Sequence, residues 1–180
     1  MTDTLVLVLN IVFRLASLLF LIRFLLQASH AQFHNPLSQA IVKATDPVCR
    51  PLRMLLKPIG SFDLASLFVA WLISTLFIGV LFFWLAGGIN IGVVLWGGLI
   101  QTLMVLTQFY LWSIIIVIIA SFVAQGSPHP ALQLFYQLIE PIMAPFRRIL
   151  PPLGPLDLSP MVVILIIFVI ESMLRQAHVI

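Results

Sequence analysis

Hydrophobic residues form four long runs along this chain, and a proline-rich polar segment separates the two runs within each half. The runs cover residues 4–28, 64–86, 98–122 and 158–180. At about 1.5 Å per helical residue, each run is long enough to cross the hydrocarbon core of a bilayer as an α-helix. We therefore expect an all-α membrane protein with four transmembrane helices.

The two proline-rich segments, residues 35–66 and 129–160, are copies of one element. Sliding the chain against itself by 94 positions aligns residues with special backbone or charge roles, without a gap. The aligned pairs are Pro36 with Pro130, Pro47 with Pro141, Pro51 with Pro145, Arg53 with Arg147, Pro58 with Pro152, Gly60 with Gly154 and Asp63 with Asp157. Since a bias toward aliphatic residues would not align these residue types together, we infer a duplication, with repeats at residues 1–94 and 95–180.

Composition supports the membrane class. Hydrophobic residues make up 62% of the 180 residues and charged residues 8%, with a mean hydropathy of +1.17, far from soluble globular proteins. Cys49 is the only cysteine, so an intrachain disulfide and a C-x-x-C site are excluded. The first run lacks a preceding basic region and a clear cleavage site, so we expect it to remain as a span.

Basic residues predict the orientation of the spans. Because each repeat contains two spans, both proline-rich segments must lie on the same side of the membrane. The segments hold six basic residues. The connection at residues 87–97 is uncharged and is expected to form a tight turn, and Arg175 is the one basic residue expected on the opposite side of the membrane. The six are Lys43, Arg50, Arg53, Lys57, Arg147 and Arg148. This bias predicts that both proline-rich segments are cytoplasmic and that the two termini are outside.

Each proline-rich segment begins with the signals of a short amphipathic helix. Asn35 is placed to cap a helix whose first residue is Pro36, and Pro130 repeats this arrangement. Apolar residues then recur at helical spacing in both copies. They are Leu37, Ala40, Ile41 and Ala44 in the first copy and Ala131, Leu134, Phe135 and Leu138 in the second. We expect each helix to lie along the membrane surface.

Further along each segment, prolines and acidic residues predict a bend and a new helix start. Asp46-Pro47 and Glu140-Pro141 resemble the start of a second helical turn, which the prolines four residues later would limit. Gly60 and Gly154 follow the bend. Asp63 and Asp157 are then placed to cap the next spans, where a carboxylate meets the positive end of the helix dipole.

Motifs in both copies resemble the YggT (YlmG-like) family over nearly the whole chain. They are Asn35-Pro36, Thr45-Asp46-Pro47, Pro51-Leu52-Arg53, Pro58-Ile59-Gly60 and Asp63 in the first copy, and Pro141, Pro145-Phe146-Arg147-Arg148, Pro151-Pro152-Leu153-Gly154 and Asp157-Leu158-Ser159-Pro160 in the second. The resemblance implies an integral protein of the bacterial inner membrane or of plastids, in a family without an established biochemical activity. Similar proteins are linked to cell-division gene neighbourhoods, to osmotic or potassium stress, and to nucleoid distribution and cofactor-protein assembly in chloroplasts.

Charged residues within the spans need partners, because an isolated charge in hydrocarbon is costly. Arg14 and Glu171 both fall near the bilayer midplane, so we predict that they form a buried ion pair, with Arg175 as a competing partner for Glu171. Helix packing is the favoured role of this pair and an ion or proton site is the alternative. Arg23, nearer the cytoplasmic end, is expected to snorkel or to meet Asp63 or Asp157.

On the cytoplasmic side, the basic residues Arg50, Arg53 and Lys57 share one helix face, and Arg147 and Arg148 supply the second copy. They are candidates for contacts with anionic lipid headgroups or with a partner protein.

Nothing in the sequence resembles a nucleophile motif, a phosphate loop or a nucleotide fingerprint, and the four histidines lack metal-ligand spacing. We therefore expect no enzyme, cofactor, metal or direct nucleic-acid partner.

The preferred hypothesis is a non-enzymatic scaffold or assembly factor, linked to cell-envelope or division processes, that acts through the proline-rich segments. The alternative is a small channel or transport-associated protein in osmotic or potassium homeostasis that uses Arg14 and Glu171. Because four spans make a narrow bundle, such a channel would need a homo-oligomer.

Overall fold

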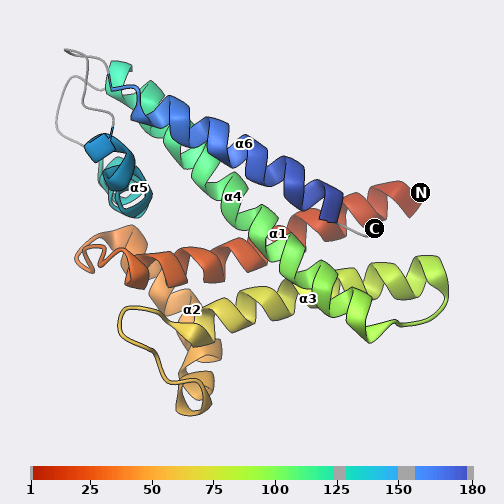
Figure 1. Cartoon of the computed structure of the whole chain (residues 1–180). Helices are drawn as coiled ribbons and strands as arrows, with labels where there is room; N and C mark the ends of the chain where they lie inside the picture. The colour runs from red at the N-terminus through yellow and green to blue at the C-terminus, as the bar shows by residue number, and fades with distance from the viewer. Residues whose placement is uncertain (1, 124–128, 150–156, 178–180) are drawn as a thin grey trace.

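The structure is a computed structural model that describes residues 2–123, 129–149 and 157–177. Within these ranges it contains six helices and no β-strand (Figure 1). They are α1 (Thr2–Ala28), α2 (Pro36–Leu55), α3 (Leu64–Ala86), α4 (Ile91–Val123), α5 (Pro130–Ile149) and α6 (Ser159–Ala177). The all-α prediction is confirmed.

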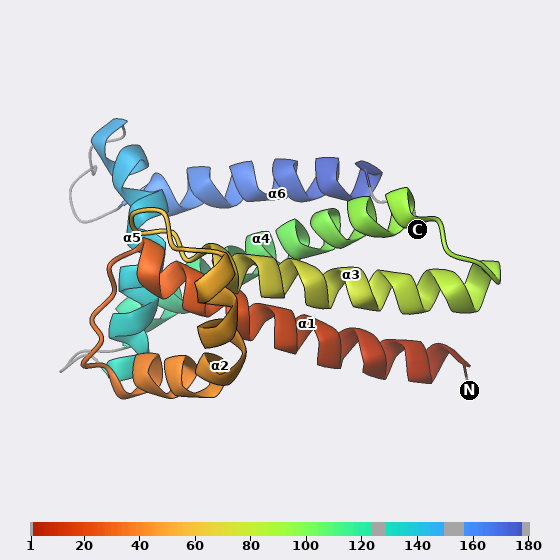
Figure 2. The same ribbon diagram turned by 90° about the horizontal axis from the view of Figure 1, so that it is seen from below.

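Four of these helices are long and apolar enough to cross a membrane: α1, α3, α4 and α6. Figure 2 shows α2 and α5 lying across one end of the four, with the N-terminus, the α3–α4 connection and the end of α6 at the opposite end. The two copies of the proline-rich segment therefore lie on the same side, as span parity predicts. We refer to α2 and α5, together with the described residues that connect them to the neighbouring spans, as the collar.

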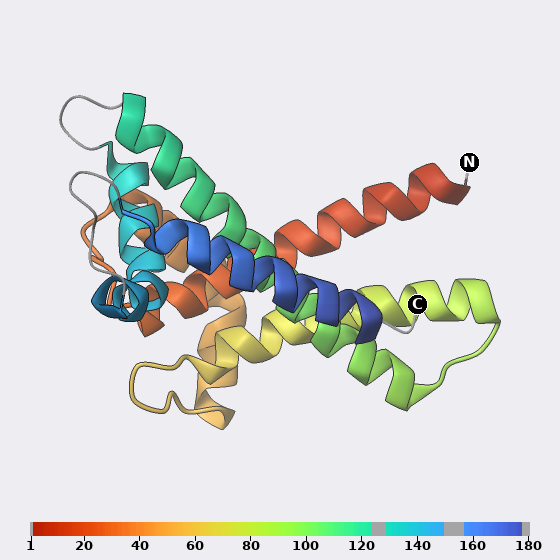
Figure 3. The same cartoon turned by 45° about the horizontal axis from the view of Figure 1, so that its top comes forward.

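In each repeat the two spans pack on each other, and the two pairs of spans then cross. α1 packs on α3 in the first repeat, and α4 packs on α6 in the second. The pairs cross where α1 meets α4 (Figure 3), and further contacts between the repeats join α3 to α4 and α2 to α5. The crossing places equivalent positions of α1 and α4 side by side.

The most tightly packed side chains lie toward the collar end of the bundle. Leu21 and Leu26 of α1, Ile114 of α4, and Leu138 and Ile139 of α5 are almost completely buried. Near the opposite end, large aliphatic residues of α1 and α6 are exposed, as expected for helix faces that contact lipid. The collar end is therefore where side chains of both repeats form a common core.

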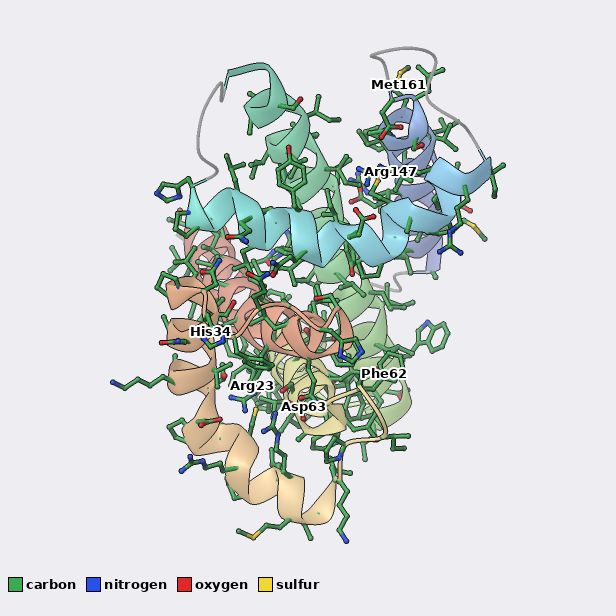
Figure 4. All side chains as sticks on the ribbon, turned by 90° about the vertical axis from the view of Figure 1, so that its left-hand side faces the viewer. Arg23, His34, Phe62, Asp63, Arg147 and Met161 are labelled. Carbon is green, nitrogen blue, oxygen red and sulfur yellow. The ribbon has the colours of Figure 1, made fainter. Side chains whose placement is uncertain are left out.

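Both collar helices continue through their internal prolines. α2 includes Pro47 and Pro51, and α5 includes Pro141 and Pro145, so the prediction that a second helical turn begins at Asp46-Pro47 and Glu140-Pro141 is wrong. Figure 4 shows that α2 bends without breaking. Each proline removes one backbone donor and opens the helix locally. Arg23 Nη1 supplies a donor to the Val42 carbonyl at 3.0 Å, next to the carbonyl that loses its donor at Pro47.

The connection between α3 and α4 is shorter than predicted. α4 begins at Ile91, so Gly97 and Gly98 are helical rather than part of a turn. A Cβ added at Gly98 would lie 2.7 Å from the Thr75 Cα, so glycine here permits close approach of α3 and α4. The remaining turn uses Gly87, whose φ of 65° is in the left-handed region that favours glycine.

Candidate functional site

The collar begins at Asn35, which both caps α2 and joins the repeats. Its Oδ1 accepts a hydrogen bond from the Leu37 N–H at 2.9 Å, and Pro36 is the first residue of the helix. The predicted cap is therefore confirmed. The Asn35 Nδ2 donates to the carbonyl of Pro130, the first residue of α5, at 2.7 Å, so the two collar helices are tied together where they start.

A second set of hydrogen bonds between the repeats lies beside this cap. The Gln32 N–H donates to Gln137 Oε1 at 2.9 Å, and Gln133 Nε2 donates to Gln32 Oε1 at 3.2 Å. These exposed side-chain bonds fix how α5 lies against the loop before α2. None of these glutamines has a role predicted from the sequence, since isolated polar residues at an interface carry no pattern.

Asp63 is the acceptor at the centre of the first repeat's collar. Arg53 Nε donates to its Oδ1 at 3.2 Å and Arg53 Nη2 to its Oδ2 at 2.5 Å, while Ser66 Oγ also donates to Oδ2 at 2.5 Å. Asp63 stands at the N-cap position of α3, but its side chain makes no capping bond, so the predicted cap is wrong. The carboxylate is fully buried, and two charged partners compensate its burial better than backbone N–H groups alone would.

The second repeat contains the equivalent pair in a more open setting. Arg147 Nε donates to Asp157 Oδ2 at 3.0 Å, and Arg147 Nη1 donates to Glu140 Oε2 at 2.8 Å. The Ser159 N–H donates to Asp157 Oδ1 at 2.9 Å, so Asp157 does meet the start of the next span as predicted. Gly60, with φ of 58°, turns the chain in the first repeat, whereas its counterpart Gly154 lies outside the described residues.

Arg23 distinguishes the first repeat from the second. Its side chain is buried and donates from Nη2 to Asp46 Oδ1 at 2.6 Å and from Nη1 to Thr45 Oγ1 at 2.7 Å. It also reaches Asp63 at 3.5 Å (Figure 4), which confirms one of the two partners expected for it. Thr45 had no predicted role, because the repeat shift aligns it with the apolar Ile139.

These contacts keep the three collar aspartates ionised. The hydrogen bond from Arg23 lowers the pKa of Asp46. Burial raises the pKa of Asp63, but hydrogen bonds from Arg53 and Ser66 outweigh burial, and the resulting pKa is below the ordinary value. At Asp157, burial is likewise outweighed by hydrogen bonds from Ser159 and Arg147, so its pKa is also lowered.

The basic residues predicted for lipid or partner contacts fall into two groups. Arg53 and Arg147 are engaged in the internal pairs described above. Arg50 is 79% exposed and reaches Asp46 only at 3.5 Å, and Lys57 and Arg148 are exposed. The second group is thus available for contacts outside the molecule, while the first shapes the collar.

The predicted ion pair between Arg14 and Glu171 is absent from the structure. Arg14 donates instead to Gln108 Oε1, and Glu171 lies 3.5 Å from Arg175 on its own helix. Arg14 and Gln108 occupy equivalent positions of the two repeats, so the crossing of α1 with α4 brings them together. Glu171 continues the buried stripe of Val163 and Ile167 on α6, which packs on α4 and α5.

Metal binding is not suggested by side-chain geometry. In residues 2–123, 129–149 and 157–177, no three His, Cys, Asp or Glu side chains come together as metal ligands would. The ion pairs of the described collar join guanidinium and carboxylate groups.

Comparison with known proteins identifies relatives over most of the chain. The chain is 40% identical to an uncharacterised protein of Pseudomonas aeruginosa over 159 residues, covering 87% of this chain and 80% of the relative. It is 35% identical over 170 residues to the uncharacterised protein YggT of Escherichia coli, covering 94% and 88%. An uncharacterised Vibrio alginolyticus protein is 38% identical over 152 residues, covering 83% and 82%. No solved structure matches the chain.

The match to a family agrees with the duplication seen in the fold. The model of the CCB3/YggT family matches twice, at residues 2–85 and 96–177, and each match includes two spans and one collar helix. With its two matched repeats and its YggT relatives, the chain belongs to the CCB3/YggT family.

Proposed function

We propose that this protein is a non-enzymatic membrane scaffold or assembly factor that acts through the collar. The observation that carries the proposal is that some basic residues of the collar form internal ion pairs while others are exposed. Arg53 and Arg147 hold the chain after each collar helix through Asp63 and Asp157, whereas Arg50, Lys57 and Arg148 face outward. A segment that is held in place by ion pairs and exposes basic residues suits the binding of a partner more than catalysis.

Apolar side chains beside these basic residues support a contact surface. Met54 and Leu55 at the end of α2 are 81% and 82% exposed, and Ile59 and Phe62 in the following loop are also exposed. An apolar patch next to basic residues matches either a partner protein or the headgroup region of a membrane. The excess of basic residues supports a cytoplasmic position for the collar. The bacterial relatives support a bacterial membrane, and we propose the inner membrane and cell-envelope or division processes as the setting.

Site-specific photocrosslinking in native membranes tests the proposal. A photoreactive residue replaces Leu55 on the collar, or, as a matched control, Ile89 at the opposite end of the bundle, which is 63% exposed. We expect discrete protein products from position 55 that are missing from position 89. The same bands from both positions would contradict docking through the collar.

A second arm asks whether the shape of the collar matters. The Arg53→Ala and Arg147→Ala changes are combined with the probe at position 55. Since these arginines hold the collar, we expect the discrete products to decrease while the amount of protein in the membrane stays comparable. Unchanged products would show that partner binding does not depend on the arginine pairs, and would overturn this part of the proposal.

The channel alternative retains one supporting observation. Glu171 is buried in a span, and its Oε1 has no hydrogen-bond partner among the residues that the structure describes. Ion flux into vesicles containing the native protein or the Glu171→Gln variant tests it. Flux that disappears in the variant would replace the scaffold proposal, and absence of flux with collar-dependent crosslinks would exclude the channel.

A further inference from the structure

The first repeat contains a polar pocket at the collar. The pocket has a volume of about 250 Å³ and lies between the end of α1 and the bent α2. Its lining residues are Arg23, Leu26, Gln27, Phe33, Val42, Asp46, Arg50 and Arg53. Three guanidinium groups thus converge on one small pocket, and the Arg23 side chain is only 3% exposed.

Comparison of the repeats shows that one of the three arginines has an arginine counterpart in the second repeat. Shifting by 94 positions places Val117 opposite Arg23, Ala144 opposite Arg50 and Arg147 opposite Arg53. Among the described residues of the second repeat, Arg147 pairs with Asp157 and Glu140. Arg23 and Arg50 therefore add positive charge at positions where the second repeat has uncharged residues.

The extra arginines change the sign of the local charge. In the first repeat, Arg23, Arg50 and Arg53 face Asp46 and Asp63, which leaves one net positive charge. The corresponding set in the second repeat is Arg147 with Glu140 and Asp157, which leaves one net negative charge. Only the first set favours an anion.

Hydrogen-bond donors also remain at the mouth of the pocket. Arg53 lines the pocket, and within the described part of the chain its hydrogen bonds use the Nε and Nη2 atoms but not Nη1. Arg50 is 79% exposed and reaches Asp46 only through Nε, at 3.5 Å. Guanidinium groups match the oxygens of a phosphate group in geometry and charge.

We propose that this pocket binds a single phosphate group, contacted by Arg50 and Arg53 and attracted by the buried charge of Arg23. The phosphate can belong to a lipid headgroup or to a small soluble anion. A lipid suits the apolar lining from Leu26, Phe33 and Val42 and the position of the pocket at the end of a span. The site does not depend on the scaffold proposal, since binding is measured on the isolated protein.

The test uses the purified full chain in a non-ionic detergent. Dihexanoyl phosphatidylglycerol and inorganic phosphate are titrated separately, and dissociation constants are measured by thermophoresis. Arg50→Ala introduces the residue type found at the equivalent Ala144. It should weaken binding about fivefold, because one basic residue near an anionic headgroup contributes about 1 kcal/mol. Lys43→Ala removes the same charge from an exposed position of α2 outside the pocket, and should change binding less than about twofold.

The Asp46→Asn variant adds a change in the opposite direction. Asp46 lines the pocket and repels an anion, so its neutralisation should tighten binding severalfold. Helical circular dichroism equal to that of the native protein confirms that the variant is folded. A looser complex in folded Asp46→Asn protein would overturn the proposal.

The two ligands identify the source of the phosphate. Saturable binding of phosphatidylglycerol that inorganic phosphate does not displace would assign the site to a lipid, whereas binding of inorganic phosphate with equal affinity would assign it to a soluble anion. Equal effects of Arg50→Ala and Lys43→Ala, or no saturable binding of either ligand, would show that no built phosphate site exists.

Discussion

Asp63 and Asp157 are equivalent residues that lie in different surroundings. The Asp63 side chain is fully buried and accepts hydrogen bonds from Arg53 and Ser66, with Arg23 at 3.5 Å. The Asp157 side chain is 35% exposed and pairs with Arg147. Because water screens an exposed pair, the same chemistry should contribute more to stability in the first repeat.

Asn substitution at these two positions measures the difference. Asp63→Asn should lower the free energy of unfolding by about 3 kcal/mol, because it leaves buried guanidinium charge without its carboxylate. Asp157→Asn should cost about 1 kcal/mol or less. Denaturant titration in mixed micelles, followed by circular dichroism, gives both values. Equal losses would mean that burial does not distinguish the two pairs.

The lowered pKa values of Asp46, Asp63 and Asp157 predict acid sensitivity. Since their folded-state pKa values lie below the unfolded value of about 3.9, the stabilisation is fully present above that value and is lost as the pH falls through the folded values. Thermal unfolding between about pH 6 and about pH 2 should show decreasing stability at the acidic end. The decrease should be smaller in Asp63→Asn, and an identical decrease would contradict the assignment.

At the scale of elements, prolines and glycines act according to what surrounds them. The prolines of α2 bend the helix, and Arg23 of α1 supplies a donor to a carbonyl at the bend. Gly97 and Gly98 occur in a helix, where a glycine normally costs stability, because α3 packs closely against them. The Ile78 side chain lies against Gly97, and the Thr75 backbone lies against Gly98. The neighbouring element therefore decides whether such a residue ends a helix or permits close packing.

The Gly98→Ala variant tests whether glycine at this position permits the close contact between α3 and α4. The new Cβ would lie 2.7 Å from the Thr75 Cα, so the helices must separate, at an expected cost of about 1–3 kcal/mol despite the better helix propensity of alanine. Gly92→Ala in the same helix is the control, since its Cβ would meet only the Asn90 Oδ1, at an ordinary 3.5 Å. Unfolding in micelles should show destabilisation only for Gly98→Ala, and equal stability of the two variants would contradict the contact.

At the scale of the whole molecule, the two repeats meet at equivalent or neighbouring positions. Arg14 bonds to its equivalent, Gln108, at the crossing of α1 and α4. Asn35 bonds to the carbonyl of Pro130, one residue after its equivalent position, at the starts of α2 and α5. A duplicated chain whose halves face each other brings equivalent positions together near the line that relates them. The crossing thus gives the charge of Arg14 a neutral polar partner from the other repeat.

Double-mutant cycles distinguish this arrangement from the ion pair that the sequence suggested. Arg14→Leu and Gln108→Leu should be coupled by about 1 kcal/mol, because the residues are in contact. Arg14→Leu and Glu171→Leu should be additive within about 0.5 kcal/mol. Unfolding in mixed micelles measures all the variants. Additivity in the first cycle with coupling in the second would contradict the observed contacts.

The sequence by itself determined the features that depend on local chemistry. Hydrophobic length predicts the four spans, parity places both collar segments on one side, and the spacing of Asn35 and Pro36 predicts a capped helix. These features need no knowledge of neighbouring helices. The alignment of Arg53 with Arg147 and of Asp63 with Asp157 also identified the residues that hold each collar, although not that each arginine pairs with its aspartate.

Only the tertiary structure decided which residues meet across helices. Spans in a bilayer are apolar on every side, so their pattern carries little information about which face packs on which neighbour. For this reason the sequence suggested Glu171 as the partner of Arg14, where the crossing supplies Gln108. The same reason explains why the helix cap predicted for Asp63 is wrong. The packing of α1, α2 and α3 brings Arg23 and Arg53 to its carboxylate instead.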